Sequence, residues 1–183
     1  QARAFTTTQV AALNATQLSA LDATQSASLT TTQVRALTAT QIGALDATDL
    51  AEFNQTQLAS LTNTQVDALT ASSVTALAAT QIAALTATQV GRLANAALSA
   101  LDATQSAALT ATQIRGLSTT QVAALDATDV SDLTTTQLAA LTTQQVQALT
   151  STNMASLNAT QVAAFTVTQL QALSTTNLNA LDA

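Results

Sequence analysis

The sequence is organised by an eight-residue period that runs without insertion or deletion from Thr6 to Leu181. Each of the 22 octads has the form cap-x-Thr-Gln-apolar-x-Ala-Leu, as in residues 86–93, TATQVGRL. We number the eight places of an octad from one, at the cap residue, to eight, at the leucine. A unit this short cannot bury its own apolar side chains, so neighbouring octads must cover one another.

Each octad carries the signals that begin a helix. The first place is Thr, Asp, Asn or Ser in 20 copies, and the exceptions are Ala78 and Ala94. The fourth place is Gln in 16 copies, which completes a capping box with the first place. The residue before the cap and the apolar fifth place form a hydrophobic staple, such as Leu85 with Val90. The repeat therefore predicts one short helix per octad.

Two other folds compete for the same pattern. In one continuous helix, eight residues would rotate the apolar pair by about 80° beyond two turns, so the apolar stripe would spiral around the helix. The Thr-rich segments also suit a β-solenoid. However, the fifth and eighth places would then point to opposite faces of a strand, and turn signals such as Asn-Gly are missing. Both arguments favour short helices.

A longer repeat is superimposed on the octads, because residues 22–101 and 102–181 align over ten octads each. Six octads lack Gln at the fourth place, and within each ten-octad unit these exceptions recur every third octad. They are Asp49, Ser73, Ala97, Asp129, Asn153 and Asn177. If they mark one edge, a superhelical turn contains 3 to 3.3 octads. Two helices per turn, or drift among equivalent copies, remain alternatives.

These observations predict an all-α solenoid of short two-turn helices, one per octapeptide repeat, with about three repeats per superhelical turn. Residues 1–183 form one solenoid domain that contains the 80-residue super-repeats 22–101 and 102–181. The fifth and eighth places should be buried and the sixth exposed. Because the sequence begins and ends within an octad, we also expect it to be a segment of a longer chain.

The composition argues against several functions. The chain has no Cys, His, Lys, Trp, Tyr or Pro, and its net charge of −6 comes from ten acidic residues and four Arg. Without His, Cys or Lys we expect no enzyme, no catalytic residue and no cofactor. A negative chain with four scattered Arg binds phosphate poorly, so we expect no nucleic-acid partner. No apolar run is long enough to predict insertion into a membrane.

The densest cluster of carboxylates is Asp46, Asp49 and Glu52, which is echoed by Asp126, Asp129 and Asp132. Oxygen ligands at this spacing would suit Ca²⁺. The alternative is that these residues cap helices and favour the helix dipole. We favour the second interpretation and predict no metal site.

Two further patterns concern hydroxyl side chains. Thr stands at the third place in 19 copies and would form a ladder along one side of the solenoid. This ladder could contact a ligand, or it could simply satisfy free N–H groups at the helix starts. Ser26 and Ser106 replace the apolar residue of the fifth place. Each would bond to a carbonyl of its own helix, or else the turn is locally looser there.

Two resemblances bear on function. Residues 85–90, LTATQV, are similar to the start of the repeats of TAL effector DNA-binding proteins, but the base-reading loop of those repeats is missing. We therefore do not predict DNA binding. As a whole, the Thr/Ala-rich octads resemble low-complexity repeat tracts in large bacterial secreted or surface proteins. This resemblance implies an extracellular or cell-surface location.

The regular unit length, the super-repeat and the low charge lead to the functional hypothesis. We expect a structural repeat protein: a rod, spacer or self-assembling filament subunit that associates with itself end-to-end or laterally. The alternative is a binding module whose Thr ladder contacts ice, glycan or a protein partner.

Overall fold

A computed structural model describes residues 2–182 of the chain, and every regular element in it is helical. No helix among these residues has the length and apolar character needed to cross a membrane. The elements in chain order are η1 (Ala2–Ala4), α1 (Thr7–Ala12), α2 (Ala15–Ser19), α3 (Ala23–Ser28), α4 (Thr31–Ala36), α5 (Ala39–Ala44), α6 (Ala47–Ala51), α7 (Gln55–Ala59), α8 (Asn63–Asp67), α9 (Ala71–Thr75), α10 (Ala79–Ala84), α11 (Ala87–Val90), α12 (Asn95–Leu98), α13 (Ala103–Ala108), α14 (Ala111–Gly116), α15 (Thr119–Ala124), α16 (Ala127–Ser131), α17 (Thr135–Ala140), α18 (Thr143–Ala148), α19 (Ser151–Ala155), α20 (Ala159–Val162), α21 (Val167–Ala172), α22 (Thr175–Asn179) and η2 (Ala180–Asp182).

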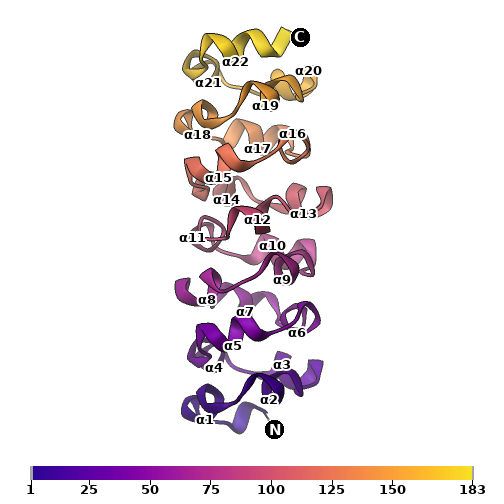
Figure 1. Cartoon of the computed structure of the whole chain (residues 1–183), viewed down its shortest axis with the longest axis vertical. Helices are drawn as coiled ribbons and strands as arrows, with labels where there is room; N and C mark the ends of the chain where they lie inside the picture. The colour runs from indigo at the N-terminus through magenta and orange to yellow at the C-terminus, as the bar shows by residue number, and fades with distance from the viewer. Residues whose placement is uncertain (1, 183) are drawn as a thin grey trace.

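The helices wind into a straight rod with the chain ends at opposite tips (Figure 1). Most helices pack on the helix three places later in the chain, as α1 does on α4 and α11 on α14. The structure thus confirms an all-α solenoid with one helix per octad. Stacking on every third helix also favours the three-sided turn over the two-helix alternative.

The predicted capping boxes are present. At the start of α11, Thr86 Oγ1 accepts a hydrogen bond from the backbone N–H of Gln89 over 3.2 Å. In return, Gln89 Oε1 accepts one from the N–H of Thr86 over 2.7 Å. Among the 22 α-helices of the described residues, only α10 and α12 lack a side-chain cap, because Ala78 and Ala94 stand there. The caps fix where each helix begins.

The corners between helices are made by the eighth and first places together. Leu85 (φ −61°, ψ 143°) ends α10 and Thr86 (φ −71°, ψ 156°) begins α11, so two extended residues redirect the chain. No residue in the described part of the chain has a positive φ. The rod therefore turns at every octad without needing glycine in the left-handed region.

The core is a continuous apolar column inside the rod. The fifth-place residues of α1–α19 are all buried, whereas at the last helix Leu178 is 48% exposed. Most eighth-place residues are buried as well, and no sixth-place residue is. The burial predicted for the fifth and eighth places is confirmed for most octads, with half-buried eighth-place residues near both tips and at Leu125. The sixth place is exposed or half-buried.

The ten-octad super-repeat has a geometric counterpart. Figure 1 places α3 and α13 on the same edge of the rod, and likewise α6 and α16. Ten octads therefore span about three turns, after which the same side of the rod is presented again. Equivalent residues of the two super-repeats lie on one side.

The caps lead to a matched pair of stability predictions. Thr86→Ala removes a cap and should lower the free energy of unfolding by about 1 kcal/mol. Leu85→Ala should cost about 2–5 kcal/mol, because Leu85 is 4% exposed and leaves a cavity. Ala78→Thr adds the missing cap of α10 and should stabilise by about 1 kcal/mol. Urea unfolding followed by circular dichroism measures all three, and equal, negligible effects would contradict the capping role.

Candidate functional site

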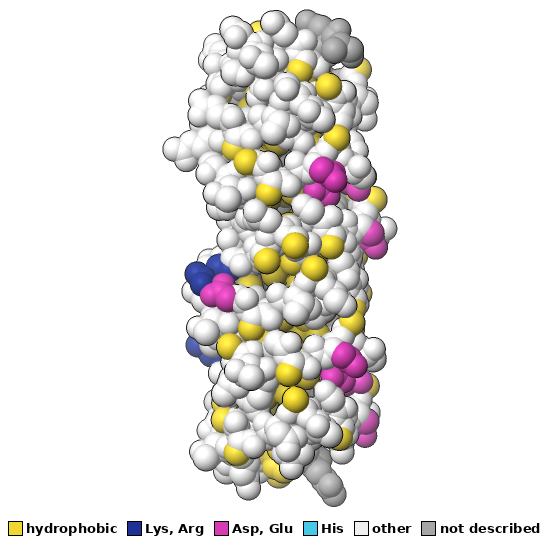
Figure 2. Space-filling model, viewed as in Figure 1, with side chains coloured by type: hydrophobic (Ala, Val, Ile, Leu, Met, Phe, Trp, Pro, Cys, Tyr) yellow, Lys and Arg dark blue, Asp and Glu magenta, His cyan; other side chains and the backbone are white. Residues whose placement is uncertain are grey.

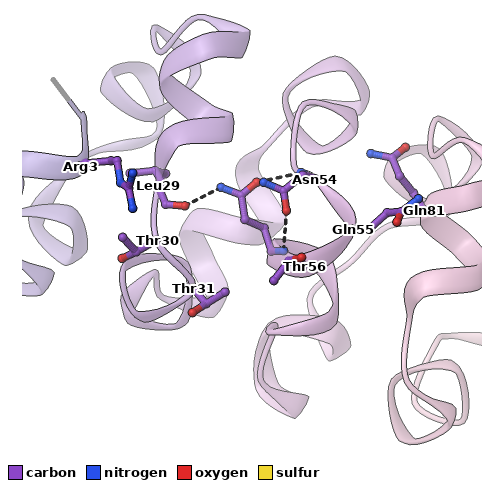
Figure 3. Close-up of a pocket in the computed structure, with 9 residues that line it drawn as sticks. Arg3, Leu29, Thr30, Thr31, Asn54, Gln55, Thr56 and Gln81 are labelled. Carbon is purple, nitrogen blue, oxygen red and sulfur yellow. Dashed lines mark hydrogen bonds between the residues drawn. The ribbon is translucent and has the colours of Figure 1, made fainter.

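The glutamine at the fourth place binds two turns of the solenoid together. In α7, Gln57 Oε1 accepts a hydrogen bond from the N–H of Asn54 over 2.8 Å. Its Nε2 donates to the carbonyl oxygens of Ser26 and Leu29, both over 2.8 Å. Figure 3 shows dashed lines from Leu29 and Asn54 to the amide that lies between them. Gln57 is only 2% exposed, so the linkage lies inside the rod.

This arrangement, which we call the glutamine clamp, recurs along the rod. Each clamp donates to two carbonyls of an earlier turn, which lie at the C-terminal end of the helix four places before. One carbonyl is at a sequence separation of 28 and the other at a separation of 30 or 31. The clamp residues are Gln33, Gln41, Gln57, Gln65, Gln81, Gln89, Gln105, Gln113, Gln121, Gln137, Gln145, Gln161 and Gln169.

The chemistry of the clamp requires an amide. The last carbonyls of a helix have no partner within it and need donors from elsewhere. A glutamine amide supplies two N–H donors for these carbonyls and one oxygen for the cap N–H. A glutamate could accept the cap bond but could not donate to the carbonyls. Because these groups are buried, leaving them unpaired would cost stability.

The sequence predicted the local half of this interaction and missed the other half. The capping box explains why the fourth place has an acceptor, but a box accepts Glu as readily as Gln. Here the fourth place is Gln in 16 octads and Glu in none. The absence of Glu from the fourth place indicates that the amide N–H groups of the glutamines have hydrogen-bond partners of their own.

The six exceptions at the fourth place weaken or remove the clamp. Asn153 and Asn177 have shorter side chains, and each amide reaches one carbonyl, that of Leu125 at 3.0 Å or Leu149 at 2.7 Å. Asp49 accepts a hydrogen bond from Ser19 Oγ over 2.6 Å. The side chains of Asp49, Ser73, Ala97 and Asp129 donate to no carbonyl of an earlier turn within the described residues.

The acidic cluster takes part in capping. Asp46 Oδ1 accepts from the N–H of Asp49 over 2.8 Å, and Asp126 Oδ1 accepts from the N–H of Asp129 over 2.9 Å. This confirms the capping interpretation for Asp46, Asp49, Asp126 and Asp129, whereas Glu52 and Asp132 stand at the C-terminal ends of α6 and α16. Within residues 2–182, no three acidic side chains lie close enough together to hold a metal ion.

The charges are unevenly distributed around the rod. Figure 2 shows acidic side chains gathered on the right-hand side, at the heights of α3 and α6 and again of α13 and α16. Eight of the ten acidic residues belong to these four octads. On the opposite side, Arg92 Nε donates to Asp67 Oδ1 over 2.9 Å. This hydrogen bond and the charge of Asp67 raise the pKa of Arg92, although an exposed pair of this kind contributes little stability.

The threonine ladder lies on the surface, since every third-place residue is exposed. Beside it runs an open groove of about 750 Å³, drawn in Figure 3, between the N-terminal turns of α4 and α7. Thr31, Gln55, Thr56 and Gln81 line it with uncharged polar groups, and Arg3 supplies its one basic side chain. The groove offers hydrogen bonds rather than a charged or reactive centre.

Ser26 and Ser106 occupy core positions, with exposures of 5% and 7%. Several serines at other places, such as Ser28 and Ser60, donate to a carbonyl of their own helix. The hydroxyls of Ser26 and Ser106 form no hydrogen bond within the described residues, so the first of the two predicted explanations does not hold for them.

Comparison with known proteins identifies one similarity. The sequence model of the ALTTAQ repeat matches residues 122–159, which span α16–α19 and the turns around them. No curated protein and no solved structure matches the chain. The match supports the description of the chain as an Ala/Thr-rich repeat protein.

Proposed function

We propose that the chain is a structural repeat protein, a rod or spacer that associates end-to-end as a filament subunit of a bacterial extracellular assembly. The observation that carries this proposal is the glutamine clamp, which ties each turn to the previous one along most of the rod. A solenoid held in this way resists separation of its turns. The extracellular location rests on the resemblance of the octads to repeat tracts of secreted and surface proteins.

Within the described residues, the glutamines of the first three octads form no clamp to a carbonyl of another turn. Gln9, Gln17 and Gln25 complete their capping boxes through Oε1, but no earlier turn of these residues lies before them. Gln9 and Gln17 are exposed. In an end-to-end contact, their Nε2 groups would bind the carbonyls of another solenoid turn.

The last turn presents the complementary groups. No clamp of the described residues reaches the carbonyls of Leu157, Phe165 or Leu173. The apolar residues Leu170 and Leu178 are also incompletely covered there, as Phe5 is at the other tip. One tip thus offers amide donors and the other offers carbonyl acceptors, each with apolar surface. A head-to-tail contact of this type is heterologous and can propagate into a filament.

Electron microscopy of the chain at micromolar concentration tests the proposal. We expect fibres with the width of one rod. Replacing Gln9, Gln17 and Gln25 together by Glu keeps the capping boxes but places carboxylates against the carbonyls of the next copy. This triple variant should keep its circular dichroism spectrum and melting temperature but appear as single particles.

A matched control introduces the same three charges at the exposed third places of the same helices, as Thr8→Glu, Thr16→Glu and Thr24→Glu together. This control variant should still form fibres. Monodisperse particles of the unmodified chain would refute end-to-end assembly, and fibres that persist in the Gln→Glu triple variant would indicate lateral association instead.

A second candidate function is supported by the exposure of the whole threonine ladder. A regular surface of methyl and hydroxyl groups could bind ice, glycan or a protein partner. Inhibition of ice recrystallisation by single rods, lost when Thr88, Thr112 and Thr120 are replaced by Lys, would support the binding module.

A further inference from the structure

Two places along the rod have the sparsest stacking. Of the helix pairs three places apart in the described chain, α3–α6 and α13–α16 are the least in contact, while pairs such as α4–α7 and α12–α15 are only slightly closer. The two junctions are ten octads apart and lie on the same edge of the rod (Figure 1). An irregularity that returns at the super-repeat is a feature of the whole rod rather than of one octad.

The sequence of each junction explains why its helices stay apart. At most octads the seventh place is Ala, which allows a helix to approach the one stacked three places before it. At α6 and α16 the seventh place is Glu52 and Asp132. Glu52 Oε2 is buried without a hydrogen-bond partner, which is unfavourable for a carboxylate and does not occur with alanine at this place.

Two further replacements occur in the octads of these junctions. Asp49 and Asp129 take the fourth place, so α6 and α16 lack the clamps that would tie them to the carbonyls of Leu21 and Leu101, at the ends of α2 and α12. Ser26 and Ser106 take the fifth place, where a larger apolar side chain would fill the core. Each junction therefore loses close helix approach and part of its core, and its later helix, α6 or α16, also lacks the clamp to the helix four places before it.

The second junction contains a small, partly open cavity of about 20 Å³. Its lining includes Ser106 of α13, Asp129 of α16, and Leu101 and Leu133. A space of this size holds about one water molecule. At the position equivalent to Leu133, the first junction has the larger Phe53, which is 2% exposed. The second junction is thus the more loosely packed of the two.

Loss of the clamp alone does not open a junction. Ser73 and Ala97 also replace Gln, yet α6–α9 and α9–α12 pack closely. In those octads the seventh place is the usual alanine, Ala76 or Ala100, and the fifth place is apolar. The open junctions need the acidic seventh place and the serine core position as well.

We propose that α3–α6 and α13–α16 are flexible joints, at which a rod of three-turn rigid segments bends and first opens. The proposal rests on the proposed structural role, because a joint matters where the rod transmits force or follows a curved surface. Each joint lies between two octads that begin with aspartate, Asp22 and Asp46 or Asp102 and Asp126, so the starts of both helices carry like charges. Because both joints face one side, bending at each occurs in the same direction.

Hydrogen exchange of the full chain, followed by mass spectrometry, tests this proposal. In the unmodified protein, amides of α13 and α16 should exchange about tenfold or more faster than those of α14 and α17. The triple variant Ser106→Val, Asp129→Gln, Asp132→Ala restores the common octad sequence at the second joint. Its α13 and α16 amides should become as slow as those of α14 and α17, while the unaltered α3 and α6 remain fast as an internal reference.

Asp126→Asn is the matched control, because it removes a charge at the start of α16 and keeps the cap acceptor without restoring the clamp. Uniform exchange along the unmodified rod would overturn the proposal, as would unchanged exchange in the triple variant or an equal slowing by Asp126→Asn alone. These results are independent of fibre formation, so failure of the joint and failure of the filament can be told apart.

Discussion

Replacing Gln113 by Glu should destabilise the solenoid by about 3–5 kcal/mol, the typical cost of a buried charge without a partner. Gln113 is 1% exposed, and its Nε2 donates to the carbonyls of Ile82 and Leu85 over 2.8 and 2.7 Å. The introduced carboxylate would keep the capping bond to Thr110 but would face two carbonyl oxygens. Urea unfolding at neutral pH measures the loss.

The same substitution at Gln9 is the matched control. Gln9 is exposed and forms a capping box with Thr6, but it has no carbonyl partner in an earlier turn. Gln9→Glu should change the stability by less than about 0.5 kcal/mol, or stabilise slightly through the helix dipole. If both substitutions had the same effect, the clamp would contribute nothing beyond the capping box.

The penalty at Gln113 should also depend on pH. Burial raises the pKa of an introduced carboxyl above its value of about 4.3 in the unfolded chain. When the pKa of the introduced carboxyl is higher in the folded than in the unfolded protein, the variant is most stable at a pH below the pKa of the unfolded chain. The carboxyl is then protonated and can donate one hydrogen bond. The stability of the variant should fall as the pH rises through the folded pKa. A difference from the unmodified protein that is constant between pH 3 and 7 would contradict the buried position.

Gly116→Ala should destabilise the rod by about 2–3 kcal/mol or more. A Cβ at Gly116 would lie 2.6 Å from the carbonyl oxygen and 2.9 Å from the Cβ of Ala87, so α11 and α14 would have to separate. Ala within a helix normally stabilises by about 0.5–1 kcal/mol relative to Gly. The expected sign is therefore opposite to the helix propensity, which makes the thermal melt diagnostic.

Gly43→Ala provides the comparison, because a Cβ there would lie 3.1 Å from the carbonyl oxygen of Ala68 and needs only a small adjustment. Its stability change should stay within about 1 kcal/mol, since the gain in helix propensity offsets the crowding. Equal effects at Gly43 and Gly116 would mean that the α11–α14 contact is not unusually close.

Local interactions within the octad could be predicted from the sequence because their partners are near neighbours in the chain. The caps, the staple and the burial of places five and eight follow from residues such as Leu85, Thr86 and Val90, and the structure confirms them. The all-α class follows in turn, because one helix per octad leaves no residues for strands.

Contacts between turns could not be predicted because their sequence separation depends on the number of octads in a turn. The bond from Gln113 to Leu85 has a sequence separation of 28, and the close approach of Gly116 to Ala87 joins helices three places apart. The three-octad spacing of the fourth-place exceptions indicated the turn, but not which side chains would meet. For Ser26 and Ser106, the looser turn was one of two explanations, and the weak contact of α3 with α6 supports it.

Residues ten octads apart face the same side of the rod. The number of octads between two surface features therefore decides whether they face the same direction. Removal of residues 22–101 would shorten the molecule by three turns and leave everything beyond the deletion pointing as before. Removal of a single octad would rotate all later octads by nearly a third of a turn and move their acidic residues to a different side. Insertion or removal of ten octads therefore leaves every later side chain facing the same direction around the rod axis. Insertion or removal of another number of octads turns the later side chains to a different direction.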